Sequence, residues 1–573
     1  MIFTPKRGKI SSYAIRDFSG FKTTVKKESA FIMRKQTKIA AVVSAAALLA
    51  LGASMTSFAA TGWQEENGTW VYYDRSGNQV TNTWAKSGDN WFYLNDNGEM
   101  AVDTLIEDDN DRYYVDANGA MVTNQWVALD NQDAGDDANQ PNAWWYYFGS
   151  NGKAYKTTST GRVSLKTING KKYTFNEDGQ MLYGWVNDNG EMVNSTDEAS
   201  EFQDGQYYFG DETDGAMATG WREISIYDDN SVDEQPGDGF WDENQTRWFY
   251  FKSSGKKTTD EKGKTINGKK YGFDQYGRML ADWHTFATTS DATVANGGLQ
   301  GNKTYSETFK YFSTPEDGAR KTKGWFKVVP GYFLNKSDYD DGSNSWFYAD
   351  GDGNIVANEI KTINGKKYAF DEYGQMVTGL HFFQMSGTKD IVSILDKKDY
   401  DTNDEYDKFY NNHAADIANG TIAAYYFGNS DDGSMKTGAQ NVDLDGESYK
   451  FQFKTSSSTK GQGTVGVDNH KLYIAGKLAK ASNDDKVTIF QYKTDGTIIP
   501  WDTADFIRHF GAIDAAHTND NHTTYAITTT AADGDFYAIN TTGGMIKSGS
   551  KKDGDDYKIH TSNYKVDSIE IDN

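Results

Sequence analysis

Short runs of large aromatic and apolar side chains recur along the chain, and each is followed by a polar turn that ends at glycine. One copy runs from Trp91 to Met100 as Trp-Phe-Tyr-Leu-Asn-Asp-Asn-Gly-Glu-Met, and similar copies begin at Trp70, Trp248 and Trp346. Aromatic residues favour β-strands, whereas Asn, Asp and Gly favour turns. The pattern therefore predicts a tandem array of short strands and turns, which presents many copies of one surface.

Aligning the copies on the turn glycine separates the two faces of each strand. Because side chains alternate along a strand, the first Trp of a copy and the residue two positions later share a face. These first residues, which we call head tryptophans, are Trp70, Trp91, Trp145, Trp248 and Trp346, and they are followed by Tyr72, Tyr93, Tyr147, Tyr250 and Tyr348. The opposite face, with Phe92 and Leu94 as examples, is apolar in nearly every copy.

A second class of copy reads Lys-Thr-Ile-Asn-Gly-Lys-Lys-Tyr and begins at Lys166, Lys264 and Lys361, about every 97 residues. It keeps the apolar face, as in Tyr173 and Phe175, but it has Lys or small residues in place of Trp and Tyr. A face that every copy keeps is predicted to be buried, where the loss of an aromatic ring costs about 3–5 kcal/mol. The Trp/Tyr face is therefore predicted to do something other than hold the fold.

A second periodic position lies seven residues before the head position in the regular copies and often follows glycine. Trp63, Trp84, Leu105 and Trp126 are spaced by 21 residues, which sets the repeat unit. The tryptophans at this position, which we call step tryptophans, are Trp63, Trp84, Trp126, Trp221 and Trp325. Longer inserts interrupt the rhythm at residues 130–142, 227–239 and 285–306.

Each unit is expected to contain a strand, a turn closed by glycine such as Asn95–Gly98, and a second strand that opens with Met or a small residue. A link at the step position then leads to the next unit. Hairpins of this size are unstable alone. We therefore predict an all-β fold, a β-hairpin solenoid of about 20-residue aromatic and glycine repeats with a divergent, β-rich C-terminal region.

The motifs resemble a known family. Thr61-Gly62-Trp63, Thr219-Gly220-Trp221, the Trp-Phe-Tyr strands and the Gly-x-Met turns resemble the cell-wall-binding repeats of choline-binding proteins from Gram-positive bacteria. The Lys-Thr-Ile-Asn-Gly copies resemble related repeats of streptococcal glucan-binding proteins and of clostridial toxin receptor-binding regions. The resemblance covers roughly residues 60–438. It implies that consecutive hairpins build aromatic cages for choline, often with Met at the wall.

The resemblance also implies which residues form the binding sites. The first cage would use Trp63, Trp70, Tyr72, Trp84, Trp91, Tyr93 and Met100, where the 21-residue spacing is unbroken. Further sets are Trp325, Trp346 and Tyr348, then Trp221, Trp248 and Tyr250, then Trp126, Trp145 and Tyr147. A quaternary ammonium donates no hydrogen bonds, so cation–π attraction of about 0.5–2 kcal/mol per ring would hold it, and several weak sites would act together along a polymer.

Two alternatives to choline stay open for these side chains. The same tryptophans could stack against sugar rings of a glucan or another carbohydrate. They could also serve only to pack one hairpin on the next, because filled and unfilled copies mix and Leu105, Leu165 and Leu380 occupy the step in some units.

Composition and charge narrow the choice of partners. The chain has no cysteine, which excludes disulfides, thiolate nucleophiles and Cys-based zinc sites. Residues 1–59 hold ten basic and two acidic residues, so the rest carries 48 basic and 80 acidic residues, a net charge of −32. Such a surface repels nucleic acid and anionic membranes. Asp350–Asn354 resembles a calcium loop, but Ile355 and Lys361 occupy the positions that need Gly and Glu, so no metal or cofactor is expected.

The two ends of the chain differ from the array. Residues 33–59 contain a basic segment, an apolar stretch and small residues before the expected cleavage after Ala59, which predicts a secretory signal peptide and no membrane insertion after its removal. Residues 1–32 are then expected to be an upstream extension before the initiating Met33. Residues 439–573 are expected to form divergent or capping repeats or a small C-terminal domain, with a helix beginning near Asp502.

These features predict a secreted, non-catalytic surface-binding protein that attaches non-covalently to choline-bearing wall polymers such as teichoic acid, or to glucan or another carbohydrate. No catalytic motif and no long non-repeat stretch are present, so no catalytic residue is expected. Two alternatives remain, namely a host-directed, glycan-binding adhesin or toxin-like receptor-binding protein, and a wall- or glucan-active enzyme with its chemistry in residues 439–573.

Overall fold

The computed structural model describes residues 61–572, with gaps at 133, 135–140, 160, 194–200, 229–243, 287–292, 296–297, 301–308, 332–333, 388–389, 396–401 and 430–431. The upstream extension and the signal peptide expected within residues 1–59, together with parts of the inserts, lie outside the described residues. The chain divides into two compact units, residues 1–261 with 272–279 and residues 262–271 with 280–573. This division falls inside the array expected for residues 60–438.

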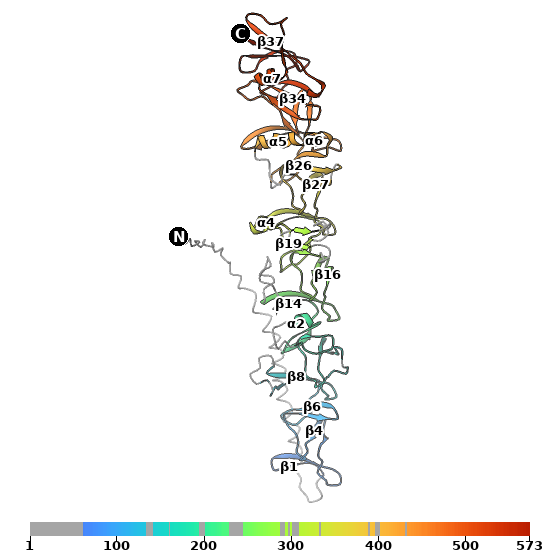
Figure 1. Cartoon of the computed structure of the whole chain (residues 1–573). Helices are drawn as coiled ribbons and strands as arrows, with labels where there is room; N and C mark the ends of the chain where they lie inside the picture. The colour runs from blue at the N-terminus through green and yellow to red at the C-terminus, as the bar shows by residue number, and fades with distance from the viewer. Residues whose placement is uncertain are drawn as a thin grey trace, which may run out of the picture. The chain divides into compact units, whose positions relative to one another are not determined.

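The first unit consists of short antiparallel hairpins in chain order (Figure 1). Its elements are β1 (Gly62–Glu66), β2 (Thr69–Tyr73), β3 (Thr83–Ser87), β4 (Asn90–Leu94), β5 (Thr104–Asp108), β6 (Asp111–Val115), β7 (Gln125–Asp130), β8 (Ala143–Phe148), β9 (Leu165–Ile168), β10 (Lys171–Thr174), β11 (Gly184–Val186), α2 (Glu201–Asp204), β12 (Tyr207–Asp211), β13 (Asp214–Met217), β14 (Gly220–Tyr227) and β15 (Asn244–Phe251). Most strands pair only with the next one, and β11, β12 and β13 form a three-stranded sheet. The division between the units runs through the next hairpin, β16 (Glu261–Ile266) with β17 (Lys269–Phe273).

Each hairpin begins with the strand that carries the step residue, half a repeat unit before the strand with which the sequence pattern began the unit. The step residue starts the first strand and lies opposite the tyrosine of the second strand, as in Trp63 opposite Tyr72. The turn between them is Asn67-Gly68, whose φ angles of +51° and +83° suit the tight turn that matches the twist of a hairpin. The Gly-closed segment Asn95–Gly98 reverses the chain as expected, but the expected second strand after it is reduced to the isolated antiparallel bridge between Leu94 and Met100.

A hydrogen bond from each linking segment joins two successive hairpins. After β4, Met100 forms an isolated bridge with Leu94 of its own hairpin. Its backbone N–H donates to the carbonyl of Trp70 in the preceding hairpin, with an N–O distance of 2.7 Å. The same bond, at 2.8 Å, is made by Met121 to Trp91, by Met181 to Trp145, by Met279 to Trp248 and by Met376 to Trp346. We call it the inter-hairpin hydrogen bond.

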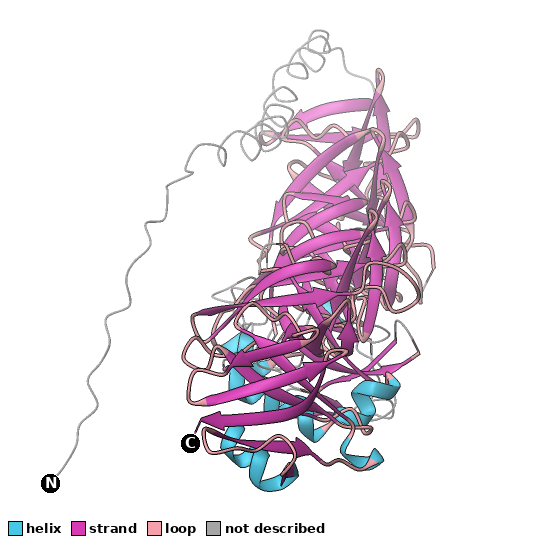
Figure 2. Cartoon of the chain, turned by 90° about the horizontal axis from the view of Figure 1, so that it is seen from above, coloured by secondary structure: helices cyan, strands magenta, loops and turns pink. Residues whose placement is uncertain are grey.

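The apolar face of the second strand is buried, as predicted. The side chains on it that are at most 4% exposed include Val71, Phe92, Leu94, Phe148, Tyr173, Phe175, Phe249, Phe251 and Phe347. They form a series of small cores, each shared by neighbouring hairpins, rather than one large core. Strands dominate the described residues, so the fold is the predicted all-β hairpin repeat fold (Figure 2).

The second unit begins with hairpins and continues with wider sheets. Its strands are β18 (Asp282–Thr285), β19 (Thr293–Ala295), β20 (Gly298–Gln300), β21 (Phe309–Phe312), β22 (Gly324–Val328), β23 (Ser345–Ala349), β24 (Glu359–Ile363), β25 (Lys366–Phe370), β26 (Gly379–Ser386), β27 (Asp390–Ile394), β28 (Ile422–Phe427), β29 (Gly438–Leu444), β30 (Glu447–Phe453), β31 (Gly466–Asp468), β32 (Lys471–Ile474), β33 (Lys477–Leu478), β34 (Val487–Tyr492), β35 (Ile498–Trp501), β36 (Gly511–Ile513), β37 (His522–Ile527), β38 (Asp535–Asn540), β39 (Gly549–Lys552), β40 (Tyr557–Ser562) and β41 (Lys565–Asp572). Its helices are α4 (Lys336–Asp340), α5 (Asn403–Asn412), α6 (Ala414–Asn419) and α7 (Thr503–Phe510), with a short 3₁₀ turn at Ala531–Asp533.

The wider sheets of the second unit begin at β24. Five-stranded sheets have the strand orders β25-β24-β27-β26-β28, β29-β30-β33-β32-β31 and β36-β37-β41-β40-β39, and β35-β34-β38 form a three-stranded sheet. Two buried tyrosines of helix α5 form hydrogen bonds with the backbone of the segments around these sheets. The hydroxyl of Tyr406 donates to the carbonyl of Ala475 at 2.7 Å, and that of Tyr410 donates to the carbonyl of Gly496 at 2.8 Å.

The C-terminal part keeps traces of the repeat. Ile539 bridges Met545, as Leu94 bridges Met100 in the first unit. The helix expected after Trp501 is confirmed as α7, whose first turn is capped because the side chain of Asp502 accepts a hydrogen bond from the N–H of Asp505. Of the helices that the structure describes, none has the length and hydropathy needed to cross a bilayer.

In several linking segments a methionine packs on the turn glycine of the next segment, and the resulting crowding can be tested. Gly119 and Gly170 both have left-handed φ angles, +77° and +81°, so alanine strains either backbone by about 1–2 kcal/mol. A Cβ at Gly119 would also lie 2.8 Å from the Met100 Cε, whereas nothing lies within 4 Å of a Cβ at Gly170. Gly119→Ala is therefore expected to lower the urea midpoint more than Gly170→Ala. Equal midpoints for the two variants would contradict the packing of Met100 on Gly119.

Candidate functional site

Each step tryptophan of three hairpins lies between its own hairpin and the next. The Trp126 ring centroid lies 5.2 Å from that of Tyr147 across the hairpin and 4.9 Å from that of Tyr173 in the following hairpin. Trp325 repeats this arrangement with Tyr348 at 5.3 Å and Tyr368 at 4.8 Å. These contacts hold successive hairpins together.

The hairpin that carries Trp221 has the same geometry. The Trp221 ring lies 5.1 Å from Tyr250 of its own hairpin and 5.7 Å from Phe273 of the following strand. The interplanar angle with Phe273 is 30°, close to the 26° between Trp126 and Phe175. Similar distances and angles at separate places show that the packing is a property of the repeat.

Each of these step tryptophans also meets the head tryptophan of its hairpin at nearly a right angle. The centroid distances and interplanar angles are 6.5 Å and 77° for Trp126 with Trp145, 6.3 Å and 84° for Trp221 with Trp248, and 6.1 Å and 90° for Trp325 with Trp346. We call these three arrangements Trp-pair sites. Their tryptophans are only partly buried, so each pair offers ring surface to a ligand.

The first expected cage is arranged differently. Trp63 contacts Tyr72 and Phe92, each at 5.3 Å. Trp84 contacts Tyr93 and Tyr113, at 5.2 and 5.1 Å, and its indole N–H donates to the Asp108 carboxylate. Across residues 61–132 of the described chain, no ring contact joins Trp63 to Trp70 or Trp84 to Trp91. The structure therefore brings the Trp pair together in the other three sets and not in this one.

Trp91 and Met100, two further members of that first set, do not lie together in one cage. The head tryptophan Trp91 is 40% exposed, and the ammonium of Lys86 lies 5.9 Å from its ring centroid. Met100 lies against Gly119 of the next linking segment, so its side chain serves as a spacer between hairpins. The Met at this position thus contributes to stacking through both its backbone N–H and its thioether.

The Trp/Tyr face of the second strand was predicted to do something other than hold the fold, but its tyrosines pack on the step tryptophans, as Tyr147 does on Trp126. The Trp126 ring also packs on Tyr173 of the following hairpin, so it helps to hold two hairpins together. The head tryptophans fit the prediction better, since they lie at the margin of these contacts.

Sequence reasoning missed the tyrosines that complete two of the sites. Tyr173 and Tyr368 belong to Lys-Thr-Ile-Asn-Gly copies, which looked like scaffold, yet they cover Trp126 and Trp325 of the preceding hairpins. Their signal was present in the order of the chain, because each such copy directly follows a hairpin with both tryptophans. Burial raises the pKa of Tyr173 to about 12, with a smaller effect of Asp214, so its ring stays neutral.

The residue opposite the head tryptophan differs between the three Trp-pair sites. It is Ala128 opposite Trp145, Glu223 opposite Trp248 and Lys327 opposite Trp346. The Lys327 ammonium lies 5.7 Å from the centroid of the Trp346 ring, so a cation of the protein itself already faces this ring. The three Trp-pair sites thus have similar ring geometry but differ in the charge of the residue opposite the head tryptophan.

Trp185 shows that the aromatic packing can hold a cation. The ammonium of the buried Lys257 lies 5.2 Å from the Trp185 ring centroid and donates a hydrogen bond to the carbonyl of Phe202. Burial lowers the pKa of Lys257 to about 8. Trp185 itself is buried, and a side chain of the same unit occupies its face.

The calcium-like turn at Asp350–Asn354 is held by its own hydrogen bonds. The Asp350 carboxylate accepts hydrogen bonds from the N–H groups of Asp352 and Asn354, at 2.9 and 2.8 Å, and so shapes the turn. Across the part of the chain that the structure describes, no three His, Asp or Glu side chains are grouped to hold a metal ion.

Comparisons with known proteins assign the repeats. Residues 60–105 and 82–126 match the model of the choline-binding repeat, and residues 145–154 match that of a putative cell wall binding repeat. Glucosyltransferase-S of Streptococcus mutans is 27% identical over 260 residues, which cover 41% of this chain. The match covers only 14% of the length of that relative.

Solved structures with similarity to the chain come from Streptococcus pneumoniae. Choline-binding protein F with a peptidoglycan analogue is 19% identical, covers 71% of this chain and 99% of its own, and gives a TM-score of 0.31. The autolysin LytC with a synthetic peptidoglycan ligand is 19% identical, covers 57% and 55%, and gives 0.28. The choline-binding domain of CbpL is 21% identical, covers 46% and 100%, and gives 0.26.

TM-scores this low establish no shared overall arrangement, so the assignment rests on the family models. The similarity to clostridial toxin repeats stays a prediction from the sequence. Residues 60–126 and 145–154 therefore match choline-binding and cell-wall-binding repeats, in a chain whose fold is an all-β hairpin repeat.

Proposed function

We propose that the protein is a secreted, non-catalytic binding protein that attaches to choline-bearing wall polymers through its Trp-pair sites. The observation that carries this proposal is the perpendicular pair of tryptophans with a neighbouring tyrosine, repeated at Trp126/Trp145, Trp221/Trp248 and Trp325/Trp346. The matches to the choline-binding repeat end at Trp126 and the match to the cell wall binding repeat begins at Trp145, so they support the proposal for the Trp126/Trp145 pair.

The chemistry of a quaternary ammonium matches these sites. Its methyl groups donate no conventional hydrogen bonds, so affinity depends on aromatic faces and on neutral or negative surroundings. Residues 60–573 carry a net charge of −32, so the surroundings of the sites are acidic overall. Each site would contribute only a few kcal/mol, but sites on one chain that engage one polymer would gain affinity through their effective concentration.

The charge beside the head tryptophan ranks the sites. Glu223 beside Trp248 favours a cation, and Ala128 beside Trp145 is neutral. Lys327 competes with an incoming cation for the ring of Trp346. We therefore propose the order Trp221/Trp248, then Trp126/Trp145, then Trp325/Trp346 for affinity toward choline.

A second candidate is glucan binding at the same tryptophans. The identity of 27% with Glucosyltransferase-S over 260 residues favours it, because the name of that relative indicates an enzyme that transfers glucosyl units. In this case sugar rings would stack on the exposed faces of the head tryptophans, and the charge of the residue opposite would have little effect.

Choline titration of two charge variants tests the order of the sites. Glu223→Gln is expected to weaken choline binding about two- to fivefold, because it removes a carboxylate worth about 0.5–1 kcal/mol to an exposed cation. Lys327→Ala is expected to strengthen binding at the third site by a similar factor. Calorimetry of the full chain without its signal segment measures both changes.

The chain offers matched controls for both substitutions. Glu65 lies opposite Trp70, and the Lys86 ammonium lies 5.9 Å from the Trp91 ring centroid, but neither head tryptophan there is paired with a step tryptophan. Glu65→Gln and Lys86→Ala should leave choline binding unchanged. If they alter it as much as the first two variants, or if choline does not bind at millimolar concentration, the proposed sites are wrong.

Paired substitutions separate the structural tryptophan from the binding tryptophan. Trp126→Ala should lower the free energy of unfolding toward the lower end of about 3–5 kcal/mol, because a half-buried ring between two hairpins is lost. Trp145→Ala should cost clearly less and should weaken choline binding. Urea unfolding followed by circular dichroism, together with the choline titration, measures both; a larger stability loss for Trp145→Ala would overturn this division.

A further inference from the structure

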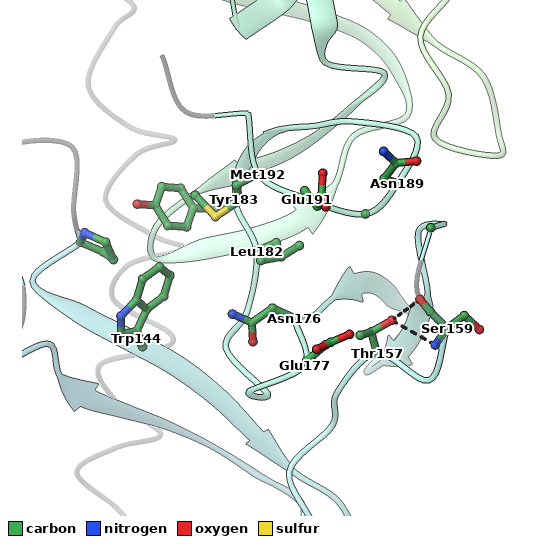
Figure 3. Close-up of a pocket in the computed structure, with 13 residues that line it drawn as sticks. Trp144, Thr157, Ser159, Asn176, Glu177, Leu182, Tyr183, Asn189, Glu191 and Met192 are labelled. Carbon is green, nitrogen blue, oxygen red and sulfur yellow. Dashed lines mark hydrogen bonds between the residues drawn. The ribbon is translucent and has the colours of Figure 1, made fainter. Parts of the chain in front are cut away.

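A cleft in the first unit lies apart from the ring contacts of the Trp-pair sites. Its volume is about 540 Å³, within the usual range for small-molecule sites. It is formed by the start of β8 with Pro141 before it, the segment after β8, and the linking segments that follow β10 and β11. Figure 3 shows Trp144, Asn176, Glu177 and Thr157 along one side and Tyr183, Met192, Glu191 and Asn189 along the other.

One end of the cleft is aromatic. The ring centroids of Trp144 and Tyr183 lie 6.5 Å apart at an interplanar angle of 47°. Trp144 precedes the head tryptophan Trp145 in β8, so the two side chains point to opposite faces of the strand. Trp144 therefore belongs to a different surface from the Trp126/Trp145 pair, although the two are adjacent in sequence.

The rest of the cleft is polar and rich in acceptors. Glu177 and Glu191 are exposed on its two sides. The side chains near them are held in place, because Asn176 donates to the Gln180 side chain at 2.7 Å and Asn187 donates to the Glu191 carboxylate at 3.0 Å. The cleft thus combines a ring surface at one end with two exposed carboxylates, of which that of Glu191 is held by Asn187.

We propose that this cleft binds a pyranose unit of a neutral polysaccharide. A pyranose ring has an apolar C–H face that stacks on an aromatic ring and hydroxyl groups that donate to carboxylates and amides. A quaternary ammonium has no such donors and would give no hydrogen bond to the carboxylates of Glu177 and Glu191. The combination of rings at one end and acceptors along both sides favours the sugar.

This site is independent of the choline proposal. The Trp-pair sites use the aromatic face of the hairpins, whereas the cleft uses the opposite face of β8 and the linking segments. A protein with both would hold the charged groups and the sugar units of a wall or glucan polymer at separate places, and either site could be absent without affecting the other.

Adjacent tryptophans of one strand provide the test. The probes are maltohexaose, isomaltohexaose and cellohexaose, titrated by calorimetry into the full chain without its signal segment. At least one probe is expected to bind, Trp144→Ala is expected to weaken it by about tenfold or more, and Trp145→Ala is expected to change it less than about twofold. Choline titration should show the reverse dependence on these two residues.

Trp144 also packs against a small core, so its substitution could affect folding as well as binding. Variants at exposed residues of the cleft therefore provide a second test. Glu177→Gln and Glu191→Gln keep the shape of the cleft and should each weaken the oligosaccharide about three- to tenfold, with unchanged circular dichroism. Binding of none of the three probes, or oligosaccharide binding that depends on Trp145 rather than Trp144, would overturn the proposal while leaving the choline result to stand by itself.

Discussion

The inter-hairpin hydrogen bond is the constraint on which the repeat depends. A two-stranded hairpin cannot bury enough surface to be stable by itself. The linking segment after each hairpin returns to its own second strand and also donates from its Met N–H to the carbonyl of the preceding head residue, as in Met100 to Trp70. This bond fixes the spacing between hairpins, and the spacing decides which side chains can fill the gap.

The fixed spacing explains why the same aromatic residues serve stability and binding. Trp126 fills the gap between two hairpins and contacts Tyr147 and Tyr173, while Trp145 meets it edge to face at the margin. The inner ring is held by packing, and the outer ring is left partly free. Variation in ligand preference then requires only a change beside the outer ring, as between Glu223 and Lys327.

Linking segments give the molecule a second kind of surface. Most of them make only an isolated bridge, and their turns vary in length and side chains. Where they lie beside the start of β8, they form an acceptor-rich cleft with Trp144. A repeat that keeps its strands constant can therefore acquire different sites in the segments between them.

The sequence by itself determined the repeat, the buried apolar face of residues such as Phe92 and Leu94, and the aromatic residue types of the sites, because these follow from local periodicity. It misplaced the hairpin turn, since Asn67-Gly68 and Asn95–Gly98 both carry turn signals and only strand pairing distinguishes them. The tertiary structure alone decided that Trp126 meets Trp145 whereas Trp63 does not meet Trp70, and that Tyr173 and Trp144 belong to sites. These contacts join separate hairpins or involve opposite faces of one strand. Their geometry depends on the inserts and on the distances between stacked hairpins, which local sequence periodicity does not predict.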